Sequence, residues 1–171
     1  MITVTRMNLF SLFLLLPIFN PILAFPVSFE QNGLFGFKDK KGKVIIKPQY
    51  EMANSFSESG IAAVVVDGKW HFINLKGEKL ARAFNFDNGP DYFNSGLARI
   101  LDSKGKFGYM DEKGKIVIKP RFDFASPFER SIARVCMGCK IDKSKDEHGE
   151  IIGGTWYLIN KRGNILRSLK K

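Results

Sequence analysis

Apolar and polar residues alternate with a period of two along most of this chain, and short polar turns interrupt the pattern at regular intervals. The clearest segment is 69–74, in which Trp70 and Phe72 stand two residues apart and therefore share one face of a predicted strand. No stretch after residue 25 sustains the 3.6-residue apolar period of an amphipathic helix. The pattern predicts an all-β protein of about twelve short strands.

The strands recur in four similar units that align on four glycine anchors. The anchors are Gly42, Gly77, Gly114 and Gly163, and nine residues before them stand Gly33, Gly68, Gly105 and Gly154, all of which we assign to turns. Seven and five residues before the anchors stand large apolar residues, which we assign to the repeat core: Phe35 and Phe37, Trp70 and Phe72, Phe107 and Tyr109, and Trp156 and Leu158. The anchors are 35, 37 and 49 residues apart, so the last interval carries an insertion, which we place at residues 136–152.

Each unit is predicted to be a three-stranded antiparallel meander, and the units lie near residues 27–58, 60–95, 96–130 and 131–169. Asn32-Gly33 and Asp67-Gly68 are typical two-residue hairpin turns between the first and second strands, because Asn, Asp and Gly tolerate positive φ angles. Units this small cannot bury an apolar face alone. Neighbouring units must therefore stack, either in a propeller-like ring or in an open solenoid.

Segments 49–58 and 121–130 link one unit to the next. Pro48 and Pro120 precede these links and are predicted to end the third strand of their units, because proline cannot donate to a sheet ladder. We expect the links to be loops or single helical turns that place an aromatic ring between units. The rings in question are Phe56, Phe93 and Phe128.

One position of the second strand distinguishes the two ends of the array. Four residues before the anchor, the first unit has Lys38, whereas the later units have Ile73, Met110 and Ile159. The later units are thus apolar on both faces of this strand. We therefore expect the first unit to be a terminal cap with a solvated outer face.

Residues 1–24 have the layout of a secretory signal peptide, and we place the repeat domain at residues 25–171. Arg6 supplies a positive charge, the apolar run Leu9–Phe19 is too short to span a membrane, and Ala24 is a small residue suited to cleavage. An uncleaved N-terminal anchor is the alternative. The layout predicts an exported protein, either periplasmic or secreted, without an integral membrane span after cleavage.

The composition is basic, with a formal net charge of +10 and a pI near 9.7. Lysines at turn tips explain this charge as a solvated surface. Binding of an anionic envelope polymer is the alternative reading of the same lysines, and we do not expect nucleic acid as a partner.

Cys136 and Cys139 form the one motif that suggests chemistry, and they lie in the insertion between a predicted strand at 132–135 and a polar loop. A local disulfide is the favoured interpretation for an oxidising compartment. Inert thiols, a redox pair and a zinc site with His148 remain open. The βαβ context of a thioredoxin-like motif is missing, however, and three candidate ligands do not close a structural zinc site.

We interpret the other polar positions as structural rather than functional. Three residues before the anchors stand Asp39, Asn74, Asp111 and Asn160, which suit the first position of a type I turn better than a cation site. His71 has no carboxylate or nucleophile at a recurring spacing, so we expect a packed or partly exposed side chain. Catalytic and phosphate-binding motifs are absent from the sequence, and we predict neither an enzyme nor a cofactor or metal site.

At these repeats the chain resembles the WG repeat family of bacterial proteins. The resemblance spans residues 27–166 and is carried by Gly68-Lys69-Trp70, by residues 108–120 and by the link at 122–128. The Trp-Gly pair that names the family appears here as Phe35-Gly36, Trp70-His71, Phe107-Gly108 and Trp156-Tyr157. The resemblance implies a β-repeat scaffold and brings no common catalytic residues.

We predict a non-enzymatic exported scaffold that binds a protein or another envelope partner. This prediction rests on the repeats, on the export signal and on the absence of catalytic motifs from the sequence. A small redox or metal-binding protein that acts through Cys136 and Cys139 is the alternative.

Overall fold

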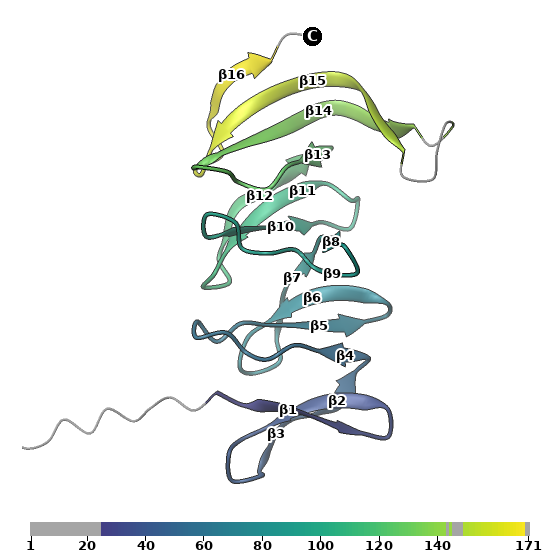
Figure 1. Ribbon diagram of the computed structural model, residues 1–171, viewed down its shortest axis with the longest axis vertical. Coiled ribbons are helices and arrows are strands. Elements are labelled where there is room, and N and C mark those ends of the chain that lie inside the picture. The colour runs from purple at the N-terminus through teal and green to yellow at the C-terminus, as the bar shows by residue number, and fades with distance from the viewer. Residues whose placement is uncertain (1–24, 143, 145–148, 170–171) are drawn as a thin grey trace, which may run out of the picture.

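The computed structural model describes residues 25–142, 144 and 149–169, so the predicted signal peptide at residues 1–24 lies outside the described residues. Every regular element in the described part is a β-strand. Four antiparallel meanders follow one another along the long axis of the molecule (Figure 1). The predicted all-β repeat architecture is confirmed, and the stack is open rather than closed into a ring.

The meanders consist of three strands each, in chain order. The first meander comprises β1 (Val27–Gln31), β2 (Leu34–Lys38) and β3 (Val44–Tyr50). The second comprises β5 (Ala62–Val66), β6 (Lys69–Ile73) and β7 (Lys79–Ala83). The third meander comprises β10 (Leu97–Leu101), β11 (Phe107–Asp111) and β12 (Ile116–Phe122). The fourth comprises β14 (Ile132–Asp142), β15 (Glu150–Asn160) and β16 (Ile165–Leu169). Four two-residue strands lie between the meanders: β4 (Met52–Ala53), β8 (Asn85–Phe86), β9 (Gly89–Pro90) and β13 (Phe124–Ala125).

Backbone hydrogen bonds join two of the links to the meander that follows, and they join the second meander directly to the third. β4 pairs with β5 and β13 pairs with β14, so two of the links add a short strand to the meander that follows. After the second meander, β7 itself pairs with β10, and β8 and β9 form an additional hairpin. The prediction that the links are loops or single helical turns is thus partly wrong. Parts of the links form short strands, because pairing with a neighbouring strand satisfies their backbone N–H and C=O groups.

Buried side chains form three clusters, and each cluster lies between two neighbouring meanders. One ring from each link stacks on the second strand of the preceding meander. The ring pairs, with their centroid distances, are Phe56 with Phe37 at 4.6 Å, Phe93 with Phe72 at 5.4 Å and Phe128 with Tyr109 at 4.7 Å. Burial of a ring of this size contributes about 2–3 kcal/mol. Each meander therefore depends on its neighbours for its core.

The second strand of a meander serves two clusters because its side chains alternate. On β11, Tyr109 belongs to the cluster shared with the fourth meander and Met110 to the cluster shared with the second, and both are fully buried. Lys38 stands at the position of Met110 in the first meander and belongs to none of the three clusters. Three predicted core residues near the ends of the stack are only half-buried: Phe35, Trp156 and Leu158.

Proline does not end the third strand of the first and third meanders, so that prediction is wrong. β3 continues past Pro48 to Tyr50, and β12 continues past Pro120 to Phe122. The register against the neighbouring strand shifts around each proline, which marks a β-bulge. A bulge tolerates proline because the ladder of hydrogen bonds is already interrupted there.

The insertion lengthens a hairpin instead of forming a loop. The predicted strand at 132–135 continues to Asp142, and β14 and β15 have 11 residues each. Gly154, which we assigned to a turn, lies inside β15 because the insertion adds residues to both strands. The other turn glycines all have positive φ angles: Gly33, Gly42, Gly68, Gly77, Gly105, Gly114 and Gly163.

Candidate functional site

A cleft of about 470 Å³ opens between the second meander and the link that follows it. Its floor consists of Trp70 and Phe72, which share one face of β6, and of Phe93 from the link. Trp70 and Phe72 are 8% and 3% exposed, so neighbouring side chains hold both rings in place. The cleft therefore has a preformed aromatic floor, which is typical of ligand sites.

Exposed side chains surround the mouth of the cleft. Met52 of β4 and Tyr92 of the following link are 53% and 68% exposed. Asp87 and Asn88 form the two-residue turn between β8 and β9 with φ angles of 48° and 65°, and this turn brings Asn88 to the cleft. The exposed amide of Asn54 also lines the opening, which therefore combines apolar surface with uncharged hydrogen-bonding groups.

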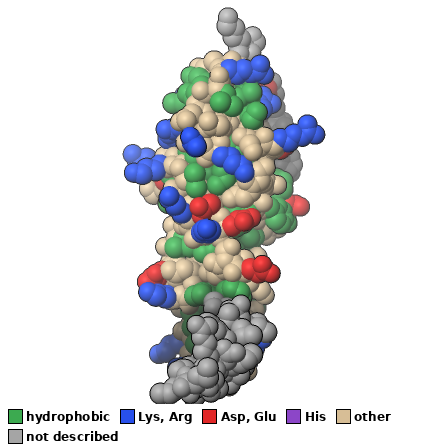
Figure 2. Space-filling view, turned by 90° about the vertical axis from the view of Figure 1, so that its left-hand side faces the viewer, with side chains coloured by type: hydrophobic (Ala, Val, Ile, Leu, Met, Phe, Trp, Pro, Cys, Tyr) green, Lys and Arg blue, Asp and Glu red, His purple; other side chains and the backbone are tan. Residues whose placement is uncertain are grey.

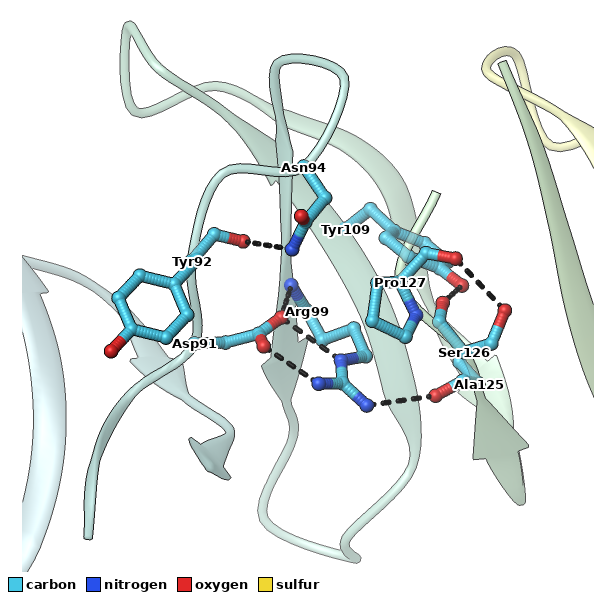
Figure 3. Close-up of polar contacts among 8 residues, drawn as sticks. All are labelled: Asp91, Tyr92, Asn94, Arg99, Tyr109, Ala125, Ser126 and Pro127. Atoms are coloured by element: carbon cyan, nitrogen blue, oxygen red, sulfur yellow. Dashed lines mark hydrogen bonds and ion pairs between the residues drawn. The ribbon is translucent and has the colours of Figure 1, made fainter. Parts of the chain in front are cut away.

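A buried ion pair fixes the link that forms one side of the cleft. The carboxylate of Asp91 accepts hydrogen bonds of 2.7 and 2.9 Å from the guanidinium of Arg99, and one of 2.8 Å from its backbone N–H (Figure 3). Both residues are 4% exposed, and Arg99 also donates to the carbonyl oxygen of Ala125 at 3.3 Å. Figure 3 shows the ring of Tyr92 pointing away from this pair.

The ion pair leaves the cleft electrically neutral. Among the described residues that line the cleft, only Asp91 is charged, and Arg99 compensates it. A buried carboxylate that already accepts three hydrogen bonds has little capacity left for a ligand. The cleft is therefore suited to an uncharged group.

Neither the ion pair nor the cleft was predicted from the sequence. One signal was available, because Arg99 interrupts the segment 97–101, in which every other residue is Leu, Ala or Ile. An arginine in such a strand needs a buried partner, since an unpaired charge in the core is costly. The partner, Asp91, lies in a link whose path a strand pattern does not define.

Cys136 and Cys139 are joined by a disulfide within β14, with 6.0 Å between their Cα atoms. Both residues are buried, at 0% and 7% exposure, which favours a structural staple over an accessible redox pair. His148, the third ligand of the zinc alternative, lies outside the described residues. Within the described ranges, no group of three or more His, Cys, Asp or Glu side chains is placed to hold a metal ion.

The Asp and Asn column before the anchors organises the turns. In each turn the side-chain oxygen accepts hydrogen bonds from the backbone N–H groups two and four residues further on, at 2.9–3.1 Å. The residues concerned are Asp39, Asn74, Asp111 and Asn160. These contacts account for the column without a cation.

His71 lies half-buried on β6, and its Nδ1 is 2.9 Å from the carbonyl oxygen of Lys69. Burial lowers the pKa of His71, and the positive charges of Lys79 and Arg82 lower it further. The imidazole is therefore uncharged at neutral pH.

Basic side chains recur at the turns of the meanders. Lys41, Lys76, Lys113 and Arg162 occupy equivalent exposed turns of the four meanders. On the face drawn in Figure 2, Lys and Arg side chains are separated by apolar, acidic and other surface. This spacing solvates the stack but provides no continuous basic track on that face.

No helix long and apolar enough to cross a membrane occurs in the part of the chain that the structure describes.

Comparison with known proteins agrees with the repeat architecture. Residues 35–70 and 107–140 match the family model of the WG containing repeat. No curated protein matches the chain. Both matched segments begin at the aromatic–glycine pair of a bulged meander, Phe35-Gly36 in one case and Phe107-Gly108 in the other. The predicted resemblance to the WG repeat family is confirmed at these two segments.

Proposed function

We propose that this protein is a non-enzymatic, exported repeat scaffold that binds a partner protein at the cell envelope through the cleft of the second meander. The observation that carries the proposal is the cleft itself, which has Trp70 and Phe72 of β6 at its floor and the exposed side chains of Met52 and Tyr92 at its mouth. Preformed, mostly apolar concavities with a few polar groups at the rim are the usual form of binding sites in proteins.

The chemistry of the cleft supports binding rather than catalysis. The hydroxyl groups of Ser55, Ser57 and Tyr92 line it, but its described lining contains no histidine, cysteine or lysine that could activate them. The carboxylate of Asp91 is engaged by Arg99 and therefore is not a free base. Acid–base and nucleophilic catalysis both need a titratable group that reaches the reacting atom.

The stacked architecture supports a scaffold. Trp70 and Phe72 belong to the cluster that also contains Ala98, Ile100 and Met110 of the third meander. The binding surface is therefore held from both sides, and little conformational entropy is lost when a partner binds.

In vivo cross-linking followed by co-purification tests the proposal. The full chain carries a C-terminal tag in a bacterial host, and a chain without residues 1–24 is the control. We expect the exported protein to begin near Phe25 and to retain a discrete protein partner at about 0.5 M salt, where exposed charge contacts are screened. Intact Met1 in the exported fraction, or a polyanion that dissociates at this salt concentration, would contradict the proposal.

A further inference from the structure

The second and third meanders have equivalent positions around their aromatic floors. Ala63 pairs with Phe72 on the second meander, as Arg99 pairs with Tyr109 on the third. In the same way, the N–H of Asn54 donates to the carbonyl of Ala63 at 2.8 Å, and the N–H of Phe84 donates to that of Arg99 at 3.1 Å. Asn54 and Ala63 therefore stand where the third meander has Phe84 and Arg99.

In the third meander this location is filled from within the chain. The ring of Phe84 lies 5.0 Å from that of Phe107, with a tilt of 53° between the ring planes. The guanidinium of Arg99 lies 4.5 Å above the ring of Phe84. The third meander thus shows what the floor of a meander accepts, namely an aromatic side chain carried by an extended segment.

In the second meander the same location is open. The short side chains of Asn54 and Ala63 stand beside Trp70 and Phe72 in place of a large pair such as Phe84 and Arg99, and both residues line the cleft. Trp70 and Phe72 remain 8% and 3% exposed at its floor. Trp70 takes the position of Phe107, and Phe72 takes that of Tyr109. The cleft is therefore the counterpart of the space that the ring of Phe84 occupies beside Phe107 in the third meander.

We propose that the cleft of the second meander takes an aromatic side chain from an extended segment of the partner protein. This inference rests on the proposed function and specifies the group that is recognised. The ring replaces the missing counterpart of Phe84 and stacks on Trp70, an arrangement that favours tilted or offset geometry. The exposed amides of Asn54 and Asn88 are placed at the rim to bond the backbone of the bound segment.

The two tryptophans of the chain provide a direct measurement, because Trp70 lies in the cleft and Trp156 lies in the last meander. N-acetyl-phenylalanine amide is titrated into the ¹⁵N-labelled protein while both indole N–H signals are followed. We expect a saturable shift of the Trp70 signal, with a dissociation constant roughly in the millimolar range, and an unchanged Trp156 signal. N-acetyl-alanine amide should shift neither signal.

Two outcomes of this titration overturn the inference. In the first, cellobiose shifts the Trp70 signal and the phenylalanine amide does not, which identifies a neutral sugar as the ligand class. In the second, the phenylalanine amide shifts both indole signals equally, which identifies non-specific contact with exposed apolar surface.

Matched variants locate the binding. Asn54→Phe introduces the residue type found at position 84 and should fill the cleft, so we expect at least a tenfold weaker shift of the Trp70 signal. Asn54→Ala leaves the cleft open and removes one rim amide, so the saturable shift of the Trp70 signal should persist with binding weakened no more than about threefold. Ala63→Leu is a second filling variant, for use if Asn54→Phe melts far below the parent. Unchanged binding by a folded filling variant overturns the inference.

The partner captured by cross-linking separates this inference from the proposed function. Loss of the partner in Asn54→Phe but not in Asn54→Ala supports both. Equal capture by the two variants leaves a partner-binding scaffold but overturns the cleft as its binding site, both in this inference and in the proposed function. Failure of the parent to capture any partner contradicts the proposed function, while the titration still decides what the cleft accepts.

Discussion

Gly36 and Gly108 hold the second position of the aromatic–glycine pair, and each lies opposite a bulge that contains a proline. A Cβ atom on Gly36 would stand 2.5 Å from the carbonyl oxygen of Ile46 and 2.7 Å from the nitrogen of Pro48. The other two meanders have His71 and Tyr157 at this position and no proline in their third strand. Glycine is thus needed where the bulge brings another backbone into contact, which gives the pair a structural reason.

Gly108→Ala should destabilise the fold, because the added Cβ would stand 2.6 Å from the nitrogen of Pro120 and backbone cannot move away as a side chain can. We expect a loss of about 3 kcal/mol, the upper end of the usual range for overpacking. Urea denaturation measures the change. Gly89→Ala is the control, since its Cβ would meet only the carbonyl oxygen of Phe86 at 3.8 Å. Equal midpoints for the two variants would refute the steric explanation.

Asp123 should make stability depend on acid pH. Its carboxylate accepts a hydrogen bond from Lys106 and another from the backbone N–H of Gly138 at 2.5 Å. The bond from Lys106 is the main cause that lowers the pKa of Asp123, and the bond from Gly138 lowers it further. A lowered pKa means that the stabilisation is complete above the unfolded-state value of about 3.9 and is lost as the pH falls through the folded-state value.

The measurement is urea unfolding of the parent and Asp123→Asn at about pH 7 and about pH 2.5. We expect the parent to be the more stable of the two at neutral pH and the difference to shrink in acid. A difference that stays constant between the two pH values would show that the charge of Asp123 contributes nothing.

At the scale of elements, the β14–β15 hairpin shows how the insertion is accommodated. Three residues of a regular strand span about 10 Å, whereas the Cα atoms of Cys136 and Cys139 are 6.0 Å apart. Gly138, between them, has a φ of 79°, and Gly154 on the opposite strand has a φ of 64°. The two strands therefore bend together at a pair of glycines, and the disulfide spans the bend.

Replacement of both cysteines by serine should leave the protein folded. The disulfide closes a loop of only four residues, so it restricts the unfolded chain little. We expect a loss of less than about 2 kcal/mol, the lower end of the usual range for a disulfide. Thermal melts provide the measurement, and thiol titration of the unreduced parent in denaturant should find no free thiol. A variant that fails to fold would show that the staple is needed for the whole hairpin.

At the scale of the whole molecule, stability is distributed over three interfaces rather than held in one core. The cluster between the second and third meanders includes Ile100 and Met110, and the cluster between the third and fourth includes Tyr109. The third meander thus contributes to two of the three clusters. In such a linear array, stability is a sum of weak unit terms and favourable interface terms.

Deletion of residues 96–130 should therefore unfold or aggregate the protein. It removes the third meander from both clusters, and it also removes Arg99 and leaves the carboxylate of Asp91 without its partner. Removal of one member of a buried ion pair alone costs about 3–5 kcal/mol. Thermal melts of the deletion, the double serine variant and the parent decide the matter. A deletion that melts like the parent would mean that the meanders fold as independent units.

The residue pattern alone predicted the all-β class, the four meanders and, except for Gly154, the residues that form their turns. These features are local, because two-residue periodicity, Asp or Asn at the start of a turn and glycine at positive φ each depend on a few neighbouring residues. It also indicated which strands are apolar on both faces, and therefore that the meanders must stack.

Features that depend on what lies opposite a residue follow from the three-dimensional fold and not from the local pattern. Pro48 stays within its strand because Gly36 across the bulge leaves room for it, and Gly154 lies within a strand because the insertion extends both sides of one hairpin. The pairing of Arg99 with Asp91 joins a strand to a link. The cleft exists because Ala63 is short where its counterpart is long, a difference that matters only once the two meanders are superimposed in space.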